Sequence, residues 1–204
     1  QIPDSGLLNL AVSQAGHVVA VNMYGIFWRF DGTTGALQAT RRVPSDSYGQ
    51  VDCLRRIDRR RLLGTPYITQ RFWEVDLQTG RGADCGRAAP GAGEILLTWR
   101  MGGRIFMAAY TGGELMEYDP GRPARFPENP RVVADPPGGM RPVAAADDGR
   151  FLYYSCSREY GTLGSVLTKY DTRTGKAEYK ADPLPDQQIQ SLGYDRKTRS
   201  LLVG

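Results

Sequence analysis

The hydrophobic residues of this chain gather in short runs, and one arrangement of hydrophobic and polar positions returns four times. Each copy is a strand-like run of apolar and aromatic residues that ends on an aspartate. The copies lie at residues 27–31 (FWRFD), 72–76 (FWEVD), 115–119 (LMEYD) and 167–171 (LTKYD). Their aspartates are 45, 43 and 52 positions apart. A spacing this regular indicates a structural repeat.

A turn signal follows each aspartate. In three copies a Thr-Gly pair stands three and four positions later, as Thr34-Gly35 does after Asp31, and the third copy has Asp119-Pro120-Gly121 instead. An aspartate carboxylate accepts hydrogen bonds from the backbone N–H groups just ahead of it, and glycine adopts the positive φ that such turns need. We therefore expect these aspartates to stabilise turns.

Two further apolar runs precede each copy. The nearer runs lie at residues 16–21, 61–64, 103–108 and 149–154, and the earlier ones at 8–12, 51–57, 95–99 and 142–146. Each unit thus predicts a strand, a tight turn, a second strand, a loop, a third strand, the aspartate turn and a fourth strand. Four antiparallel strands in 40 to 50 residues are typical of one blade of a β-propeller.

The sequence therefore predicts an all-β fold in which residues 1–204 form one β-propeller domain or part of one. The blades are expected at about residues 5–44, 49–90, 93–136 and 140–184, and residues 187–204 supply the first two strands of a fifth, at 188–194 and 200–203. An open set of blades leaves hydrophobic faces and strand edges bare. We expect a part of a six- to eight-bladed ring. The alternatives are that the last strands close a smaller ring, or that a second copy or another chain completes it.

The repeat resembles that of a known group of propellers. The Asp-x-x-Thr-Gly turn after an aromatic strand, together with residues 144–153 (AAADDGRFLY), resembles the YVTN, SMP-30 and quinoprotein-like repeats over nearly the whole chain. Kelch repeats are the second choice, through residues 102–106 and 118–120, and the hemopexin type is the third, through residues 27–31. These groups include lactonases, dehydrogenases, lyases and scaffolds without catalysis. The resemblance thus implies a fold and assigns no catalytic residue.

Composition narrows the classes of function. Lys plus Arg number 26 and Asp plus Glu 22, and a net charge of +4 is too small to indicate nucleic-acid binding. No apolar run approaches the length of about 18 residues that indicates membrane insertion. His17 is the sole histidine, and the three cysteines form no C-x-x-C pair. We therefore predict no cofactor and no metal site, and we leave open whether the chain is an enzyme.

The loops at one end of the ring are the best candidates for a binding site. Loops between the second and third strands and connections between blades converge there around the axis. The longest such loop spans residues 155–165 and contains Arg158, Glu159 and Tyr160. A cation, a carboxylate and an aromatic ring suit a polar ligand or a peptide. The alternative is a solvated insertion.

Three more tyrosines stand in corresponding loops. Tyr48, Tyr67 and Tyr110, together with Tyr160, would form an aromatic rim around this end of the ring. Packing between blades explains the same tyrosines as well. Arg141 closes the connection into the fourth blade at this end, so it completes the set of candidate ligand-binding residues.

Other conspicuous residues favour structural roles. Residues 55–61 hold five arginines, which we assign to an exposed turn, and His17 is expected to be exposed at the start of a strand. Trp28 and Trp73 are expected to pack between blades. Trp99 lies on an innermost strand and is a weak candidate for lining the central channel.

Two functions from different classes remain. The first is a non-catalytic scaffold that binds a protein or a small polar ligand through the loops at one end of the ring. The alternative is an enzyme of the lactonase or dehydrogenase kind, with a metal or a quinone cofactor in the central channel and some site residues outside this chain. The absence of a recognised catalytic motif favours the scaffold.

Overall fold

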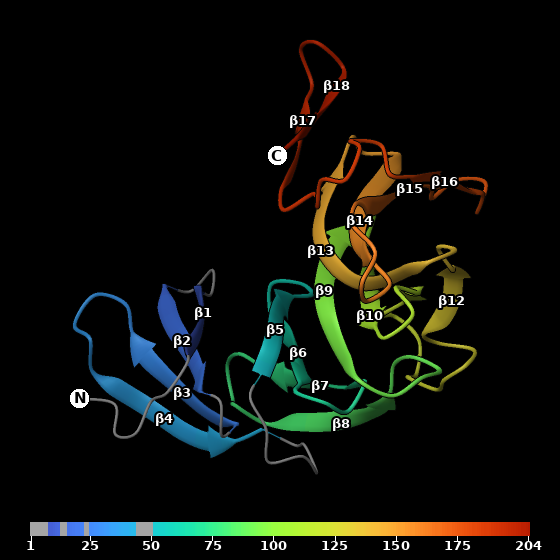
Figure 1. Cartoon of the computed structure of the whole chain (residues 1–204). Helices are drawn as coiled ribbons and strands as arrows, with labels where there is room; N and C mark the ends of the chain where they lie inside the picture. The colour runs from blue at the N-terminus through green and yellow to red at the C-terminus, as the bar shows by residue number, and fades with distance from the viewer. Residues whose placement is uncertain (1–7, 13–15, 23–24, 44–50) are drawn as a thin grey trace.

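This computed structural model describes residues 8–12, 16–22, 25–43 and 51–204. The regular elements in those ranges are β-strands, and they form four four-stranded antiparallel sheets followed by a hairpin (Figure 1). We call the sheets blades 1 to 4. No helix within the described ranges is long and apolar enough to cross a membrane.

The strands of each blade follow one another in chain order from the innermost to the outermost. Blade 1 comprises β1 (Leu8–Val12), β2 (His17–Asn22), β3 (Ile26–Asp31) and β4 (Leu37–Arg42). Blade 2 comprises β5 (Val51–Arg56), β6 (Arg61–Pro66), β7 (Arg71–Asp76) and β8 (Gly82–Arg87). Blade 3 comprises β9 (Glu94–Met101), β10 (Arg104–Tyr110), β11 (Leu115–Tyr118) and β12 (Arg131–Ala134). Blade 4 comprises β13 (Gly139–Asp147), β14 (Phe151–Arg158), β15 (Ser165–Asp171) and β16 (Ala177–Ala181), and the hairpin is β17 (Leu192–Asp195) with β18 (Ser200–Val203).

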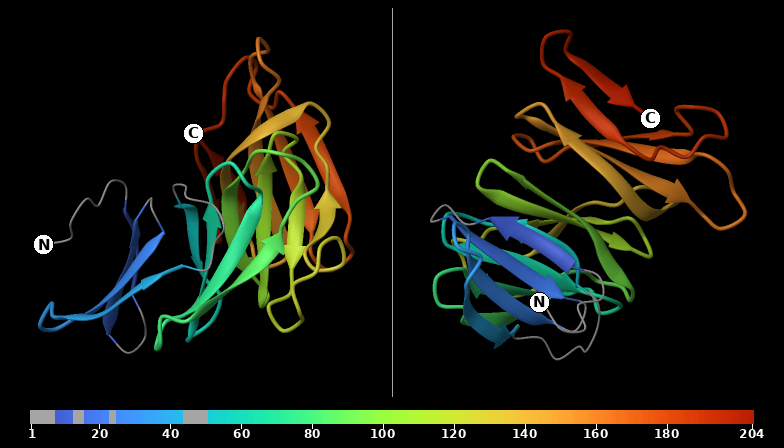
Figure 2. Two further views of the ribbon diagram at one scale, coloured as in Figure 1. Left: turned by 90° about the horizontal axis from the view of Figure 1, so that it is seen from below. Right: turned by 90° about the vertical axis from the view of Figure 1, so that its left-hand side faces the viewer.

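The blades fan out around an axis. The innermost strands β1, β5, β9, β13 and β17 lie beside one another in that order. In Figure 1 and in the right-hand view of Figure 2 the hairpin β17–β18 lies far from blade 1, so the described strands form an open arc. The predicted fold class is confirmed: the chain is all-β, with four-stranded antiparallel sheets arranged as part of a propeller.

The hydrophobic core lies between neighbouring blades. One cluster joins blades 1 and 2 through residues such as Val21, Phe27 and Trp73, and two others join blades 2 and 3 and blades 3 and 4. Trp73 therefore packs between blades, as predicted, and Trp28 is buried as well. A blade with two apolar faces gains most of its stability from being covered on both sides.

The aspartate turns form as the repeat predicts. One carboxylate oxygen of Asp31 accepts hydrogen bonds from the N–H groups of the second and third residues after it, at 2.9 and 2.8 Å, and Asp76 and Asp171 do the same. Asp119 accepts one such bond, from Gly121 at 2.9 Å. The structural role assigned to these residues is confirmed.

An arginine at or beside the start of the second strand adds an ion pair to this turn. Arg104 contacts Asp119, Arg60 contacts Asp76, and Arg150 Nη2 lies 2.5 Å from an oxygen of Asp171. This cation ties the second strand of a blade to the end of the third.

We expect the Asp171 turn to make stability depend on acidity. The hydrogen bond from Arg150 and those from backbone N–H groups hold the pKa of Asp171 well below its usual range. A carboxyl whose pKa is lower in the folded state stabilises the fold fully above its unfolded pKa of about 4, and this stabilisation is lost as the pH falls through the folded pKa. Urea unfolding should therefore show Asp171→Asn less stable than wild type at pH 7, with a smaller gap at pH 3. An equal gap at both pH values would contradict this prediction.

The arginine-rich turn corrects one expectation. Residues 57–60 connect β5 and β6 as predicted, with Arg59 exposed, but Ile57 is 3% exposed and Arg55 and Arg61 are half-buried. The local pattern of charges does not reveal that blade 3 covers this side of blade 2. His17, expected to be exposed, is also half-buried and lies opposite Asp31.

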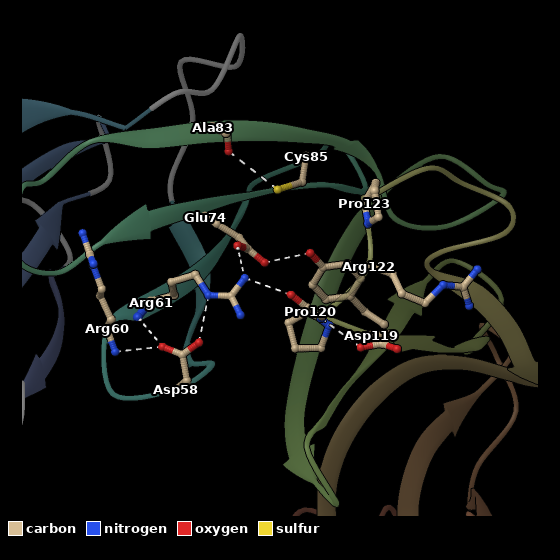
Figure 3. Close-up of polar contacts among 12 residues, drawn as sticks. Asp58, Arg60, Arg61, Glu74, Ala83, Cys85, Asp119, Pro120, Arg122 and Pro123 are labelled. Carbon is tan, nitrogen blue, oxygen red and sulfur yellow. Dashed lines mark hydrogen bonds and ion pairs between the residues drawn. The ribbon is translucent and has the colours of Figure 1, made fainter.

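Blades 2 and 3 share a network of polar contacts, which Figure 3 shows. Glu74 on β7 accepts a hydrogen bond from the Tyr118 hydroxyl at 2.8 Å and another from Arg61 Nη1 at 3.1 Å. The same nitrogen of Arg61 donates to the Pro120 carbonyl at 3.0 Å, and Arg61 Nε donates to Asp58 at 2.8 Å. One carboxylate thus joins two strands of blade 2 to the third strand of blade 3.

Candidate binding site

Five of the seven predicted site residues surround one pocket between blades 3 and 4. The pocket has a volume of about 280 Å³. It lies at the end of the blades where the loops between second and third strands occur, which we call the loop end. Four segments form it: the end of β10, the start of β13, the end of β14 with the loop that follows, and the connection between β16 and β17. Its lining residues are Tyr110, Met140, Arg141, Ser157, Arg158, Glu159, Tyr160, Gly161, Thr162 and Gln188.

Two tyrosines bridge the blades at the rim of this pocket. The Tyr110 and Tyr160 hydroxyl oxygens are 2.8 Å apart, which is a hydrogen bond between blade 3 and blade 4. Arg141 Cζ lies 4.5 Å from the centre of the Tyr110 ring, within the range of a cation–π contact. Tyr160 is 76% exposed. A partner that approaches this end of the molecule therefore meets Tyr160 first.

The two phenols are not equivalent. The hydrogen bond between them and the Arg141 guanidinium both lower the pKa of Tyr160. The pKa of Tyr110 is raised by that same hydrogen bond and by burial. The Tyr160 oxygen thus lies in the field of a cation.

The surrounding charges define what this pocket can bind. The Arg141 and Arg158 guanidinium groups match the geometry of a carboxylate or a phosphate, and the exposed Glu159 can accept from an amide or an ammonium group. A second hollow of about 580 Å³ shares Met140, Glu159 and Tyr160 with the first. The two hollows thus adjoin each other, which suits an extended ligand.

Blade 2 holds Tyr110 in place through a residue that the sequence did not indicate. Gln70 is buried, and its side-chain nitrogen donates to the Tyr110 carbonyl at 2.6 Å and to the Ala92 carbonyl at 3.3 Å. Its backbone has a φ of 44°, in the left-handed region. Nothing in the sequence around Gln70 marked it, because its role depends on contacts between blades.

The remaining two candidate residues do not join this pocket. Tyr67 follows β6 in blade 2, is 42% exposed and lines neither hollow. Tyr48 lies outside the described residues. Of the aromatic rim expected from the sequence, the structure brings together Tyr110 and Tyr160.

The central channel has a different chemistry. A pocket of about 320 Å³ lies along β5, β9 and β13, and its polar side chains are Cys53, Arg55, Thr98 and Trp99. A divalent cation needs several carboxylate, imidazole or thiolate ligands. The described residues contain no cluster of three such groups, and the Arg55 guanidinium, at 5.7 Å from the Trp99 ring centre, occupies a ring face on which a quinone would stack. A metal or a quinone at this place would therefore need residues from outside this chain, as the alternative function supposes.

Comparisons with known proteins show the fold alone. No protein-family model and no curated protein matches the sequence. Solved structures that the chain resembles include a computationally designed protein, Ika8, with a TM-score of 0.68 at 12% identity over 96% of this chain, and the β-propeller domain of Myceliophteria thermophila Cps50 (Swd1), with 0.62 at 17% over 96%. A third is the tricorn protease, with 0.62 at 14% over the whole chain.

The chain spans part of each of these proteins, namely 57% of Ika8, 61% of the Cps50 domain and 20% of the tricorn protease. At such identities the likeness carries no activity from one protein to another. The chain is therefore several blades of a β-propeller.

Proposed function

We propose that this chain is a binding scaffold without catalysis of its own, and that it binds a protein or a small polar ligand at the loop end of blades 3 and 4. The observation that carries the proposal is the convergence of Tyr110, Arg141, Arg158, Glu159 and Tyr160, from three separate segments, on one pocket. A rigid scaffold that brings loops of two blades together is the usual basis of a binding site.

The ligand that fits best is a peptide segment that carries a carboxylate. Arg141 and Arg158 supply two guanidinium groups, while Tyr110 and Tyr160 supply flat apolar area with hydrogen-bonding tips. Tyrosine and arginine are among the residues that contribute most energy at protein interfaces. Leu163, exposed in the same loop as Tyr160, extends the apolar part of this surface.

The proposal includes a larger ring. We propose that residues 1–204 form one partial propeller domain of the YVTN, SMP-30 and quinoprotein-like kind, within a ring of six to eight blades. Support comes from the open arc and from the hairpin, where Leu202 and Val203 are exposed. The remaining blades come from further chain, from a second copy or from another protein. A net charge of +4 gives no reason to propose nucleic acid as the partner.

Selection from a library of random peptides tests the loop-end site. The chain is immobilised, bound peptides are enriched, and their affinities are measured for the wild type, Arg141→Ala and Tyr160→Ala. We expect acidic peptides to be enriched. Their affinity should fall by about tenfold or more in each variant, because each substitution removes a contact with the peptide. A tenfold fall corresponds to about 1.4 kcal/mol of binding energy. Far-UV circular dichroism checks that the variants fold.

Arg125→Ala is the matched control. Arg125 is exposed in the loop between β11 and β12, at the opposite end of blade 3. The enriched peptides should bind this variant as they bind the wild type. Peptides that bind Arg141→Ala and Tyr160→Ala with unchanged affinity, or that lose affinity for Arg125→Ala alone, would overturn the proposal.

A further inference from the structure

Arg55 is a half-buried cation on the axial side of the arc. It lies on β5 and reaches across to β9, where Nε donates to Thr98 Oγ1 at 3.3 Å and Nη2 donates to the Thr98 carbonyl at 2.5 Å. Its guanidinium carbon lies 5.7 Å from the centre of the Trp99 ring. These neutral contacts fix where the guanidinium group lies without neutralising its charge.

Arg55 differs in this respect from Arg61 and Arg104, which are also half-buried but each contact at least one carboxylate. No ion pair among the residues that the structure describes includes Arg55. A charge withdrawn from water without a counter-charge is costly, so a site of this kind favours an anion from solution.

The acidic residue that contacts Trp99 is already engaged. Asp147, at the end of β13, accepts a hydrogen bond from Trp99 Nε1 at 2.9 Å and lies 3.7 Å from Arg196 Nη2. Neither carboxylate oxygen of Asp147 contacts Arg55. Trp99 thus contacts a carboxylate through its Nε1 atom and a guanidinium group over its ring.

The space beside Arg55 can hold a small molecule. The axial pocket has a volume of about 320 Å³ and is lined by three consecutive residues or more from each of β5, β9 and β13. The Thr98 carbonyl accepts from Arg55 and therefore points away from β10. In an antiparallel sheet the N–H and C=O groups of one residue face the same side of the strand, so the Thr98 N–H group also points away from β10. The inner edge of β9 thus supplies a backbone donor beside the cation.

We propose that this axial pocket binds a small oxyanion, a carboxylate or a phosphate, with Arg55 as its cationic partner and the inner edge of β9 as a further donor. The Trp99 ring forms the apolar wall on which the rest of such a ligand lies. This site is separate from the loop-end pocket and does not depend on it. It also differs from a metal centre, since its charge is of the opposite sign.

Titration with inorganic phosphate and, separately, with acetate tests this assignment. The Trp99 indole N–H resonance, identified by its loss in Trp99→Phe, is followed in a ¹⁵N-labelled protein while sodium chloride keeps the ionic strength constant. We expect a saturable shift with at least one of the two anions, and the stronger binder tells a phosphate site from a carboxylate site. A shift that does not saturate with either anion would overturn the proposal.

Two variants and one control locate the binding. Arg55→Gln removes the charge and should weaken binding by about tenfold or more. Arg59→Gln removes an equal charge from the exposed turn that follows β5 and should leave binding unchanged. If Arg55→Gln fails to fold, Thr98→Val, which removes the oxygen that orients Arg55, should weaken binding several-fold. Wild-type affinity in whichever of the two variants folds would also overturn the proposal.

Discussion

Replacing Gly64 with alanine is expected to destabilise the protein by about 3 kcal/mol, at the upper end of the usual cost of an overpacked core. Gly64 lies on β6 directly opposite Trp73 on β7. A Cβ at position 64 would lie 2.0 Å from Cζ2 of the Trp73 ring. Trp73 is 1% exposed and is packed among residues of blades 1 and 2, so its ring has no space into which to move. Urea unfolding measures the loss.

A second substitution at the point of contact separates this clash from a general effect of removing glycine. Trp73→Leu leaves a cavity. The double variant with Gly64→Ala should cost less than the sum of the two single changes, because the smaller leucine removes the clash and the alanine methyl group fills part of the cavity. Gly91→Ala is the control, since the atoms nearest to a Cβ there are 3.5 Å away, in the Gln70 side chain. Additive effects in the double variant would contradict the clash.

Replacing Glu74 with alanine is expected to cost about 2 kcal/mol, because it leaves two partly buried groups without their common acceptor. Tyr118 loses the oxygen that lies 2.8 Å from its hydroxyl, and Arg61 loses one of its two carboxylate partners and keeps Asp58 (Figure 3). Burial and the Glu74 carboxylate together raise the pKa of Tyr118. Absorbance titration of the tyrosines should therefore show that pKa fall in the variant, which a change in packing alone would not predict.

Glu178→Ala is the matched control for Glu74. Glu178 forms an ion pair with Lys169 at 3.5 Å within blade 4, but its side chain is 73% exposed. Its removal should change the free energy of unfolding by less than about 0.5 kcal/mol, as for other surface ion pairs. If Glu74→Ala and Glu178→Ala lower the free energy of unfolding equally within error, the network between the blades contributes little to stability.

The strands were predictable because each blade repeats the same local signals. The aspartate turn ends a third strand wherever it occurs, so residues 72–76 match β7 (Arg71–Asp76) to within one residue. The predicted strand bounds are less accurate where a hydrophobic residue lies in a connection between blades. Residues 188–194 read as a strand, but β17 begins at Leu192. Ile189 instead is buried against blade 4, where its N–H donates to Ser165 Oγ at 2.7 Å.

The site was predictable in part for the same reason. The repeat places Tyr110 and Tyr160 in loops at the same end of the blades, and the structure joins their hydroxyls. It did not indicate that Arg141 lies over the Tyr110 ring or that Gln70 anchors Tyr110. Those contacts depend on how neighbouring blades are placed, and no local pattern of residues records that. The local sequence likewise predicts an exposed turn at Arg55, because it does not show that blade 3 covers this residue.

Hydrogen exchange tests the central claim, that partners bind at the loop end of blades 3 and 4, most directly. Amide exchange is measured by mass spectrometry for the free chain and for the chain saturated with a peptide enriched in the selection above. We predict slower exchange at residues 110–113, 139–141 and 157–162, with no change at residues 56–61 at the opposite end of blade 2. Protection confined to the opposite end, or no protection at the loop end at saturation, would contradict the account.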